Sequence, residues 1–215
     1  MPPTTYFRRS LGLPVIAVCL GPTMSLAQVS HLPQERRVLL EEFTAINCGN
    51  CPAGHAVATA LVAAHPDDIV LVNMHAGPLA VPSVGQPDLR CSSSTQLLAE
   101  LGVTFTPQGL VGRRAYNGTT LLSSGAWVGA SNAVLSLPAV VNMAIDHQFD
   151  AVTRVLDVQV ELYYTADSPG GNDQLFVLLT EDHVHGYQQN YGAGGAIADY
   201  DHRHVLRAYL TPLEG

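Results

Sequence analysis

The chain has 215 residues, of which 47% are hydrophobic and 13% are charged, and its formal net charge at pH 7 is −8. All ten of its basic residues are arginines, so chemistry that needs a lysine, such as Schiff-base formation or a phosphate-loop lysine, is excluded. The acidic balance and the lack of a basic cluster argue against a nucleic-acid partner, and the apolar content predicts a folded core rather than a disordered chain.

The first 27 residues have the features of a secretory signal peptide. Arg8 and Arg9 precede a short apolar stretch over 11–20, and Ser25 and Ala27 supply the small residues of a cleavage site. The apolar stretch is too short for a membrane-spanning helix, which needs roughly 20 residues. We therefore predict an exported protein that is cut after Ala27, has no integral membrane span and folds where disulfides form.

The next part of the chain has the pattern of a β-α-β unit. Residues 38–43 and 69–75 are apolar runs typical of buried strands, and residues 53–64 between them have the alanine content and apolar spacing of a helix. A single crossover of this kind predicts two parallel strands with a right-handed connection. The elements expected after them are a loop over 76–94, a short helix over 95–102, an extended segment over 103–113 and a helix over 124–135.

The pattern changes near residue 137. From residue 139 onward apolar residues alternate with polar ones, which is typical of antiparallel strands with one buried face. A glycine-rich segment over 186–200 is predicted to be a long mobile loop. We predict a mixed α/β domain over 28–137 and a β-rich, sandwich-like domain over 138–215, which we expect to be truncated or to be completed by a partner.

The clearest chemical signal is the motif Cys48-Gly49-Asn50-Cys51, which lies between the first predicted strand and the helix. At a helix N-terminus the unpaired backbone N–H groups and the helix dipole favour the thiolate form of Cys48. Cys51, one turn further, is placed to attack a mixed disulfide. Two other interpretations stay open: a permanent disulfide that holds a loop, and a metal site that adds His55 and His75 to the two cysteines.

The motif and two further features resemble the thioredoxin superfamily. Glu42 lies six positions before Cys48, where those proteins often bury a carboxylate near the second cysteine. Thr106-Pro107 opens a strand, where they have a cis-proline that faces the disulfide. The resemblance implies that Cys48 attacks and Cys51 resolves, that Glu42 helps proton transfer at Cys51, and that Pro107 shapes the substrate groove.

The stretch VLLEEFTAINCGNCPAG (38–54) also resembles the opening block of the Omp28-related outer membrane proteins. Other similar segments are Asp88-Leu89-Arg90, LGVTFTPQGLVGR (101–113), Glu181-Asp182, Gln188 and HRHVLR (202–207). The similarity covers most of residues 36–211. It implies a secreted or envelope-associated protein of the periplasm, outer membrane or cell surface, with a thioredoxin-like domain followed by a β-rich domain.

Two functions of different classes follow from these observations. The first is thiol–disulfide exchange with cysteine-containing exported proteins through Cys48 and Cys51, without a cofactor. The alternative is a non-enzymatic envelope or surface protein with a structural disulfide on a thioredoxin-like scaffold. Glu42 and Pro107 favour the first function. Asn47 favours the second, because many thioredoxins have an aromatic residue at that position.

Three features remain outside this motif. Cys91 is expected to be a free thiol, with disulfide exchange or a link between two chains as alternatives. Arg207 lies in an apolar run and is expected to pair with an acid such as Glu181 or Asp182. Two H-x-H pairs place imidazoles on one side of a strand and are interpreted as solvated histidines rather than metal ligands; they are His183/His185 and His202/His204.

Overall fold

The computed structural model describes residues 5–9, 28–168, 170 and 172–213. The apolar stretch and the cleavage site of the predicted signal peptide lie outside these residues. The chain forms two compact units. We call them the ribbon unit, made of residues 1–35 and 138–173, and the sheet unit, made of residues 36–137 and 174–215.

Six strands form the sheet of the sheet unit: β2 (Val38–Thr44), β3 (Ile69–His75), β4 (Gln108–Val111), β5 (Leu122–Ser123), β8 (Leu178–Glu181) and β11 (Val205–Tyr209). Their order in the sheet is β5-β4-β2-β3-β11-β8. β2 and β3 are parallel, as the β-α-β pattern predicts, and β11 lies parallel to β3 on its other side. The remaining pairs are antiparallel. The strand order leaves β5 and β8 at the two edges of the sheet.

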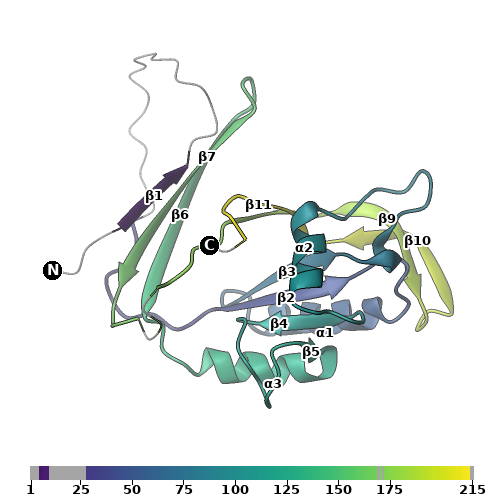
Figure 1. Cartoon of the computed structure of the whole chain (residues 1–215), viewed down its shortest axis with the longest axis horizontal. Helices are drawn as coiled ribbons and strands as arrows, with labels where there is room; N and C mark the ends of the chain where they lie inside the picture. The colour runs from purple at the N-terminus through teal and green to yellow at the C-terminus, as the bar shows by residue number, and fades with distance from the viewer. Residues whose placement is uncertain (1–4, 10–27, 169, 171, 214–215) are drawn as a thin grey trace. The chain divides into compact units, whose positions relative to one another are not determined.

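Helices cover both faces of this sheet: α1 (Cys51–Ala64) and α3 (Ser124–Leu135) lie on one face and α2 (Ser92–Glu100) on the other (Figure 1). Because side chains alternate along a strand, Leu40 of β2 packs with α1 and α3 while Phe43 packs with α2. Burial on both faces explains why β2 and β3 are continuous apolar runs in the sequence.

Most elements predicted in this part of the chain are confirmed. The strand over 69–75 and the helix over 124–135 have the predicted limits. The helix predicted to begin at residue 95 begins instead at Ser92. The reason is a cap that the sequence pattern did not reveal, in which the Cys91 sulfur accepts a hydrogen bond from the Ser94 N–H.

The glycine-rich segment over 186–200 is not a loop, and that prediction is wrong. It forms most of an antiparallel hairpin made of β9 (Val184–Asn190) and β10 (Gly195–His202). Most of its glycines lie in or beside the turn between the strands. Gly186 instead permits close packing, because a Cβ there would come within 2.8 Å of the Pro87 ring.

The ribbon unit is an antiparallel sheet of β1 (Thr5–Arg9), β7 (Val155–Tyr164) and β6 (Val141–Asp150), in that order. The chain before the sheet unit packs on it, because the Asn142 side-chain amide donates hydrogen bonds to the Ser30 and Leu32 carbonyls, at 2.6 and 2.7 Å. Alternate residues of β6 are apolar and exposed; they include Met143, Ile145 and Phe149.

The course of the chain differs from the predicted division into two consecutive domains. The chain leaves the sheet unit at residue 137 and returns to it at residue 174, where β8 and β11 enter the six-stranded sheet. Alternation in a sequence identifies a strand but not the sheet that it joins. Val205 is fully buried because β11 pairs with β3. The fold is mixed α/β, with a six-stranded sheet and several β-hairpins, in agreement with the predicted class in outline.

Candidate functional site

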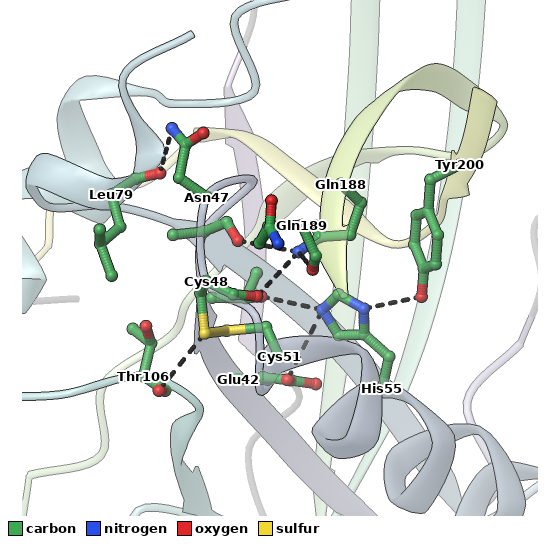
Figure 2. Close-up of a disulfide and its surroundings, with 12 residues drawn as sticks. Glu42, Asn47, Cys48, Cys51, His55, Leu79, Thr106, Gln188, Gln189 and Tyr200 are labelled. Carbon is green, nitrogen blue, oxygen red and sulfur yellow. Dashed lines mark hydrogen bonds and ion pairs between the residues drawn. A yellow bond between two sulfur atoms is a disulfide. The ribbon is translucent and has the colours of Figure 1, made fainter. Parts of the chain in front are cut away.

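A disulfide joins Cys48 and Cys51 where β2 ends and α1 begins (Figure 2). Turn hydrogen bonds run from the Cys48 N–H to the Ala45 carbonyl and from the Cys51 N–H to the Cys48 carbonyl, at 3.1 and 3.2 Å. Pro52 fits the first turn of α1, where its missing N–H costs no intrahelical hydrogen bond. Cys51 is fully buried, and Cys48 is only 5% exposed.

Glu42 and Pro107, the other two predicted site residues, lie beside the disulfide. The Thr106–Pro107 peptide bond is cis, and the Thr106 carbonyl oxygen lies 3.4 Å from the Cys48 sulfur. Gly54 of α1 lies between Glu42 and Pro107, because a Cβ at this glycine would come within 2.9 Å of both side chains. The fold therefore brings together all four residues that the sequence singled out.

Two neighbouring glutamates of β2 are fully buried but have different surroundings. Glu41 accepts two hydrogen bonds from the Arg113 guanidinium, at 2.7 and 2.8 Å, and one from the Tyr209 hydroxyl, at 3.1 Å. For the Glu42 carboxyl oxygens, no hydrogen-bond partner is found among the described residues. Burial raises the pKa of Glu42 well above its usual value, which favours the neutral carboxyl.

His55 of α1 connects Glu42 to the β9–β10 hairpin. Its Nε2 lies 2.8 Å from the Thr44 hydroxyl oxygen and 3.7 Å from a Glu42 carboxyl oxygen, and its Nδ1 lies 2.8 Å from the Tyr200 hydroxyl. Burial, helped by the nearby His202, lowers the pKa of His55 to about 3. Glu42 and His55 therefore meet as two neutral groups and not as an ion pair.

The β9–β10 hairpin packs on the Cys48–Cys51 turn, and we call this contact the hairpin clamp. Hairpin donors bind main-chain carbonyls of the turn: the Gln188 side-chain amide binds Ala45 and Cys48 at 3.2 and 3.1 Å, the Gln189 N–H binds Ile46 at 2.7 Å, and the Tyr191 N–H binds Gly49 at 2.9 Å. Gln188 is fully buried in this contact. Gly49 is required there, because a Cβ would come within 2.5 Å of the Tyr191 ring.

Asn47, where the sequence departs from the thioredoxin pattern, holds the turn from another direction. Its side-chain amide donates hydrogen bonds of 3.0 Å to the carbonyls of Leu79 and Val81. These carbonyls belong to the segment predicted as a loop, which contains the short 3-10 helix η1 (Pro78–Ala80). The amide therefore gives the turn a second anchor to the main chain.

The two H-x-H pairs do not converge on one site. His183 and His185 are exposed and contact the carboxylates of Asp201 and Asp199, at 3.2 and 2.9 Å. His202 is instead buried, with its ring centroid 5.3 Å from that of His75. Across the described ranges, no three His, Cys, Asp or Glu side chains are placed to hold a metal ion together. In particular, the disulfide occupies both cysteines of the alternative metal site.

Two single-residue predictions can be compared with the structure. Cys91 is a free, half-buried thiol at the start of α2, as expected. Arg207 forms the predicted ion pair with Glu181, at 2.6 Å, and also donates a hydrogen bond of 2.9 Å to the Asp88 carbonyl. The Cys91 side chain caps α2, and the Arg207 side chain joins β11 to Glu181 of β8.

Comparison with known proteins adds a family and two similar folds. A family model described as outer membrane protein Omp28 matches residues 94–215. The chain is similar to HBP35 of Porphyromonas gingivalis, with a TM-score of 0.58 and 20% identity over 83% of this chain and 57% of that chain. It is also similar to protein AGR_C_4864 from Agrobacterium tumefaciens, with a TM-score of 0.51 and 16% identity over 83% of this chain and 73% of that chain. At these identities the two likenesses concern the fold alone.

No curated protein matches the chain. Within the part of the chain that the structure describes, none of the helices has the length and apolar character needed to cross a membrane.

We expect Glu42→Gln to stabilise the protein increasingly as the pH rises above about 4.5, the usual pKa of a glutamate. In the unfolded chain Glu42 ionises near that pH, whereas burial keeps its proton in the folded protein, so the wild type loses stability as the pH rises. Glutamine does not ionise, so the difference in free energy of unfolding grows by up to about 1.4 kcal/mol per pH unit. Urea unfolding between pH 4 and pH 8 measures this difference.

Glu100→Gln, at an exposed position of α2, is the matched control. It should change the free energy of unfolding by less than about 0.5 kcal/mol at every pH in the series. If the effect of Glu42→Gln is equally independent of pH, Glu42 is not held neutral by burial.

Proposed function

This chain belongs to the Omp28 outer membrane protein family, which places it among exported, envelope-associated proteins, and we propose that it is a non-enzymatic surface protein with a structural disulfide. In this proposal residues 1–27 are a signal peptide that is cut after Ala27, so the mature ribbon unit keeps β6 and β7 and loses β1. The sheet unit is a thioredoxin-like scaffold. The hairpin clamp is the observation that carries the proposal.

Thiol–disulfide exchange requires a partner thiolate to reach one of the two sulfur atoms. Cys51 is fully buried, and only 5% of Cys48 is exposed. The carbonyls of Cys48 and Gly49 already accept hydrogen bonds from the hairpin. Moving the hairpin away would break these bonds and the others of the clamp, and it would expose buried Gln188. A disulfide that stays closed avoids this cost.

The disulfide has a structural task in this arrangement. Cross-links stabilise a fold more when they close long loops, and Cys48 and Cys51 are only three residues apart. We infer that this bond acts mainly by fixing the turn whose carbonyls bind the hairpin. Tyr191 can pack on Gly49 only while the turn keeps this shape. The disulfide would thus hold together two parts of the sheet unit that are far apart in the sequence.

The thioredoxin-like scaffold is supported by the order of elements in the sheet unit. The motif follows β2 and opens α1, which crosses over to the parallel strand β3. The cis Thr106–Pro107 bond precedes β4, which pairs antiparallel with β2. Gly54 of α1 packs against Pro107 and so brings the proline next to the first turn of the helix.

We expect the disulfide to resist reduction and to be inactive in exchange. Its reduction potential should lie below about −300 mV, as is typical of structural disulfides in exported proteins. Equilibration with dithiothreitol buffers, followed by mass spectrometry of alkylated Cys48 and Cys51, measures the potential. An insulin-reduction assay measures turnover. Both are carried out with Cys91→Ser, so that the Cys48–Cys51 pair is the reacting group. A potential above about −230 mV together with insulin turnover contradicts the structural role.

Thiol–disulfide exchange with cysteine-containing exported proteins is the second candidate function, and the positions of Glu42 and Pro107 favour it. In the reduced protein, the Cys48 thiolate would attack a partner disulfide, forming a mixed disulfide and releasing one partner thiolate. Once Glu42 has lost its own proton to solvent, its carboxylate would take the proton of the Cys51 thiol, and the Cys51 thiolate would attack the Cys48 sulfur of the mixed disulfide, releasing the second partner thiolate. The protein ends oxidised and the partner ends reduced. A raised pKa makes the Glu42 carboxylate a stronger base for this step.

For this second candidate, Cys51→Ala is the informative variant. Without its resolving thiol the protein should accumulate mixed disulfides through Cys48, which non-reducing electrophoresis and mass spectrometry of envelope fractions detect. Cys48→Ala is the matched control and should form none. With purified reduced protein and a model disulfide, Glu42→Gln should slow resolution about 100-fold. If Cys51→Ala forms no more mixed disulfide than Cys48→Ala does, exchange is excluded.

A further inference from the structure

A cavity of about 360 Å³ lies in the sheet unit, on the side of His55 that faces the β9–β10 hairpin. It is lined by residues of α1, β3 and β10 and of the turn that follows β10. The wall includes apolar side chains such as Leu71 and four histidines, which are His55, His75, His202 and His204. Its other polar side chains include Asn73, Tyr200, the carboxylate of Asp201 and the guanidinium of Arg203.

Three buried side chains in this wall each have a hydrogen-bond acceptor without a partner among the described residues. These atoms are His75 Nδ1, His202 Nδ1 and Asn73 Oδ1. His75 and His202 are 1% and 2% exposed, and Asn73 is 7% exposed. A fourth wall atom without a partner among the described residues is Oδ1 of Asp201, whose side chain is half-buried. Buried polar atoms are normally paired, so the three unpartnered atoms on buried side chains of one cavity wall indicate a shared ligand.

The other polar atoms of two of these side chains fix their orientation. His202 Nε2 lies 3.3 Å from the Tyr187 carbonyl oxygen and donates to it, which leaves the lone pair on Nδ1. The Asn73 side-chain N–H donates a hydrogen bond of 2.9 Å to the Arg203 carbonyl, which leaves Oδ1 as a free acceptor. Histidines that bind metals are typically held in this way, with the second ring nitrogen donating to a backbone carbonyl.

The two imidazoles also lie close together, and both are uncharged. The rings of His75 and His202 are 5.3 Å apart between centroids and meet edge-on, at an interplanar angle of 75°. Burial lowers the pKa of both histidines, so both are neutral and their lone pairs are available near pH 7. Neutral imidazoles are good ligands for zinc, copper and nickel ions.

We propose that this cavity binds one divalent transition-metal ion, such as Zn²⁺, through His75, His202 and the amide oxygen of Asn73. The protein supplies two imidazoles and one amide oxygen. A site with two histidines and an asparagine agrees with the finding that, among the described residues, no three His, Cys, Asp or Glu side chains can hold a metal together. Water molecules in the cavity complete the coordination sphere. The site combines His202 of one H-x-H pair with His75 of β3.

The test is isothermal titration of the full-length protein with Zn²⁺ at pH 7.5, after dialysis against a chelator. We expect one ion per chain and micromolar affinity, with shifts of the imidazole nitrogen resonances of His75 and His202 in NMR spectra. His202→Gln should weaken binding at least about tenfold. The matched control is the double variant His183→Gln/His185→Gln, which removes two exposed histidines and should bind like the wild type.

Measurements on the wild type keep the proposal testable if variants of the buried histidines fail to fold. Zn²⁺ should raise the unfolding temperature and shift the imidazole nitrogen resonances of His75 and His202, while those of the exposed His183 and His185 stay unchanged. The proposal is overturned if the folded wild type does not bind Zn²⁺, if the exposed double variant abolishes binding, or if Zn²⁺ shifts the resonances of His183 and His185 but not those of His75 and His202.

Discussion

The hairpin clamp is the contact on which the arrangement of the site depends. The Gln188 side chain and the Gln189 and Tyr191 amides bind carbonyls of a turn that lies about 140 residues earlier in the chain. The Cys48–Cys51 disulfide closes this turn, and Gly49 leaves room for the hairpin to approach. The same hairpin carries Tyr200 to His55 and His202 to His75, so the clamp also positions the polar interior of the sheet unit.

In that interior, neutral polar groups lie beside the Glu41–Arg113 ion pair. Glu41 is stabilised by the Arg113 guanidinium, whereas its neighbour Glu42 is desolvated and faces His55 at 3.7 Å. Desolvation raises the pKa of Glu42 and lowers the pKa of His55, so both groups are uncharged. The fold therefore avoids the cost of burying an isolated charge. The buried Glu42 carboxyl is compatible with either function, a static scaffold or an exchange reaction. What separates these functions is access to the sulfur atoms, and Cys51 is fully buried while only 5% of Cys48 is exposed.

The part of this fold that depends on local sequence was predictable, and the part that depends on distant pairing was not. Apolar runs and helix spacing predicted β2, α1 and β3, whereas the place of Glu42 and Pro107 beside the disulfide was implied by the resemblance to the thioredoxin superfamily. The hairpin was missed because its strands contain many polar residues and the turn between them is rich in glycine. Its partners are recognisable only in three dimensions: Tyr200 lies 145 residues from His55. For the same reason, alternation did not reveal that β8 and β11 join the central sheet.

Hydrogen exchange at the Gln189 and Tyr191 amides tests the clamp most directly, because both donate to the turn that the disulfide fixes. The amides of β6 and β7, in the ribbon unit, serve as an internal control. If the disulfide positions the turn for the hairpin, reduction should speed exchange at these two amides at least about tenfold while leaving the control amides unchanged. Equal protection of Gln189 and Tyr191 in the oxidised and reduced proteins would contradict the structural role of the disulfide.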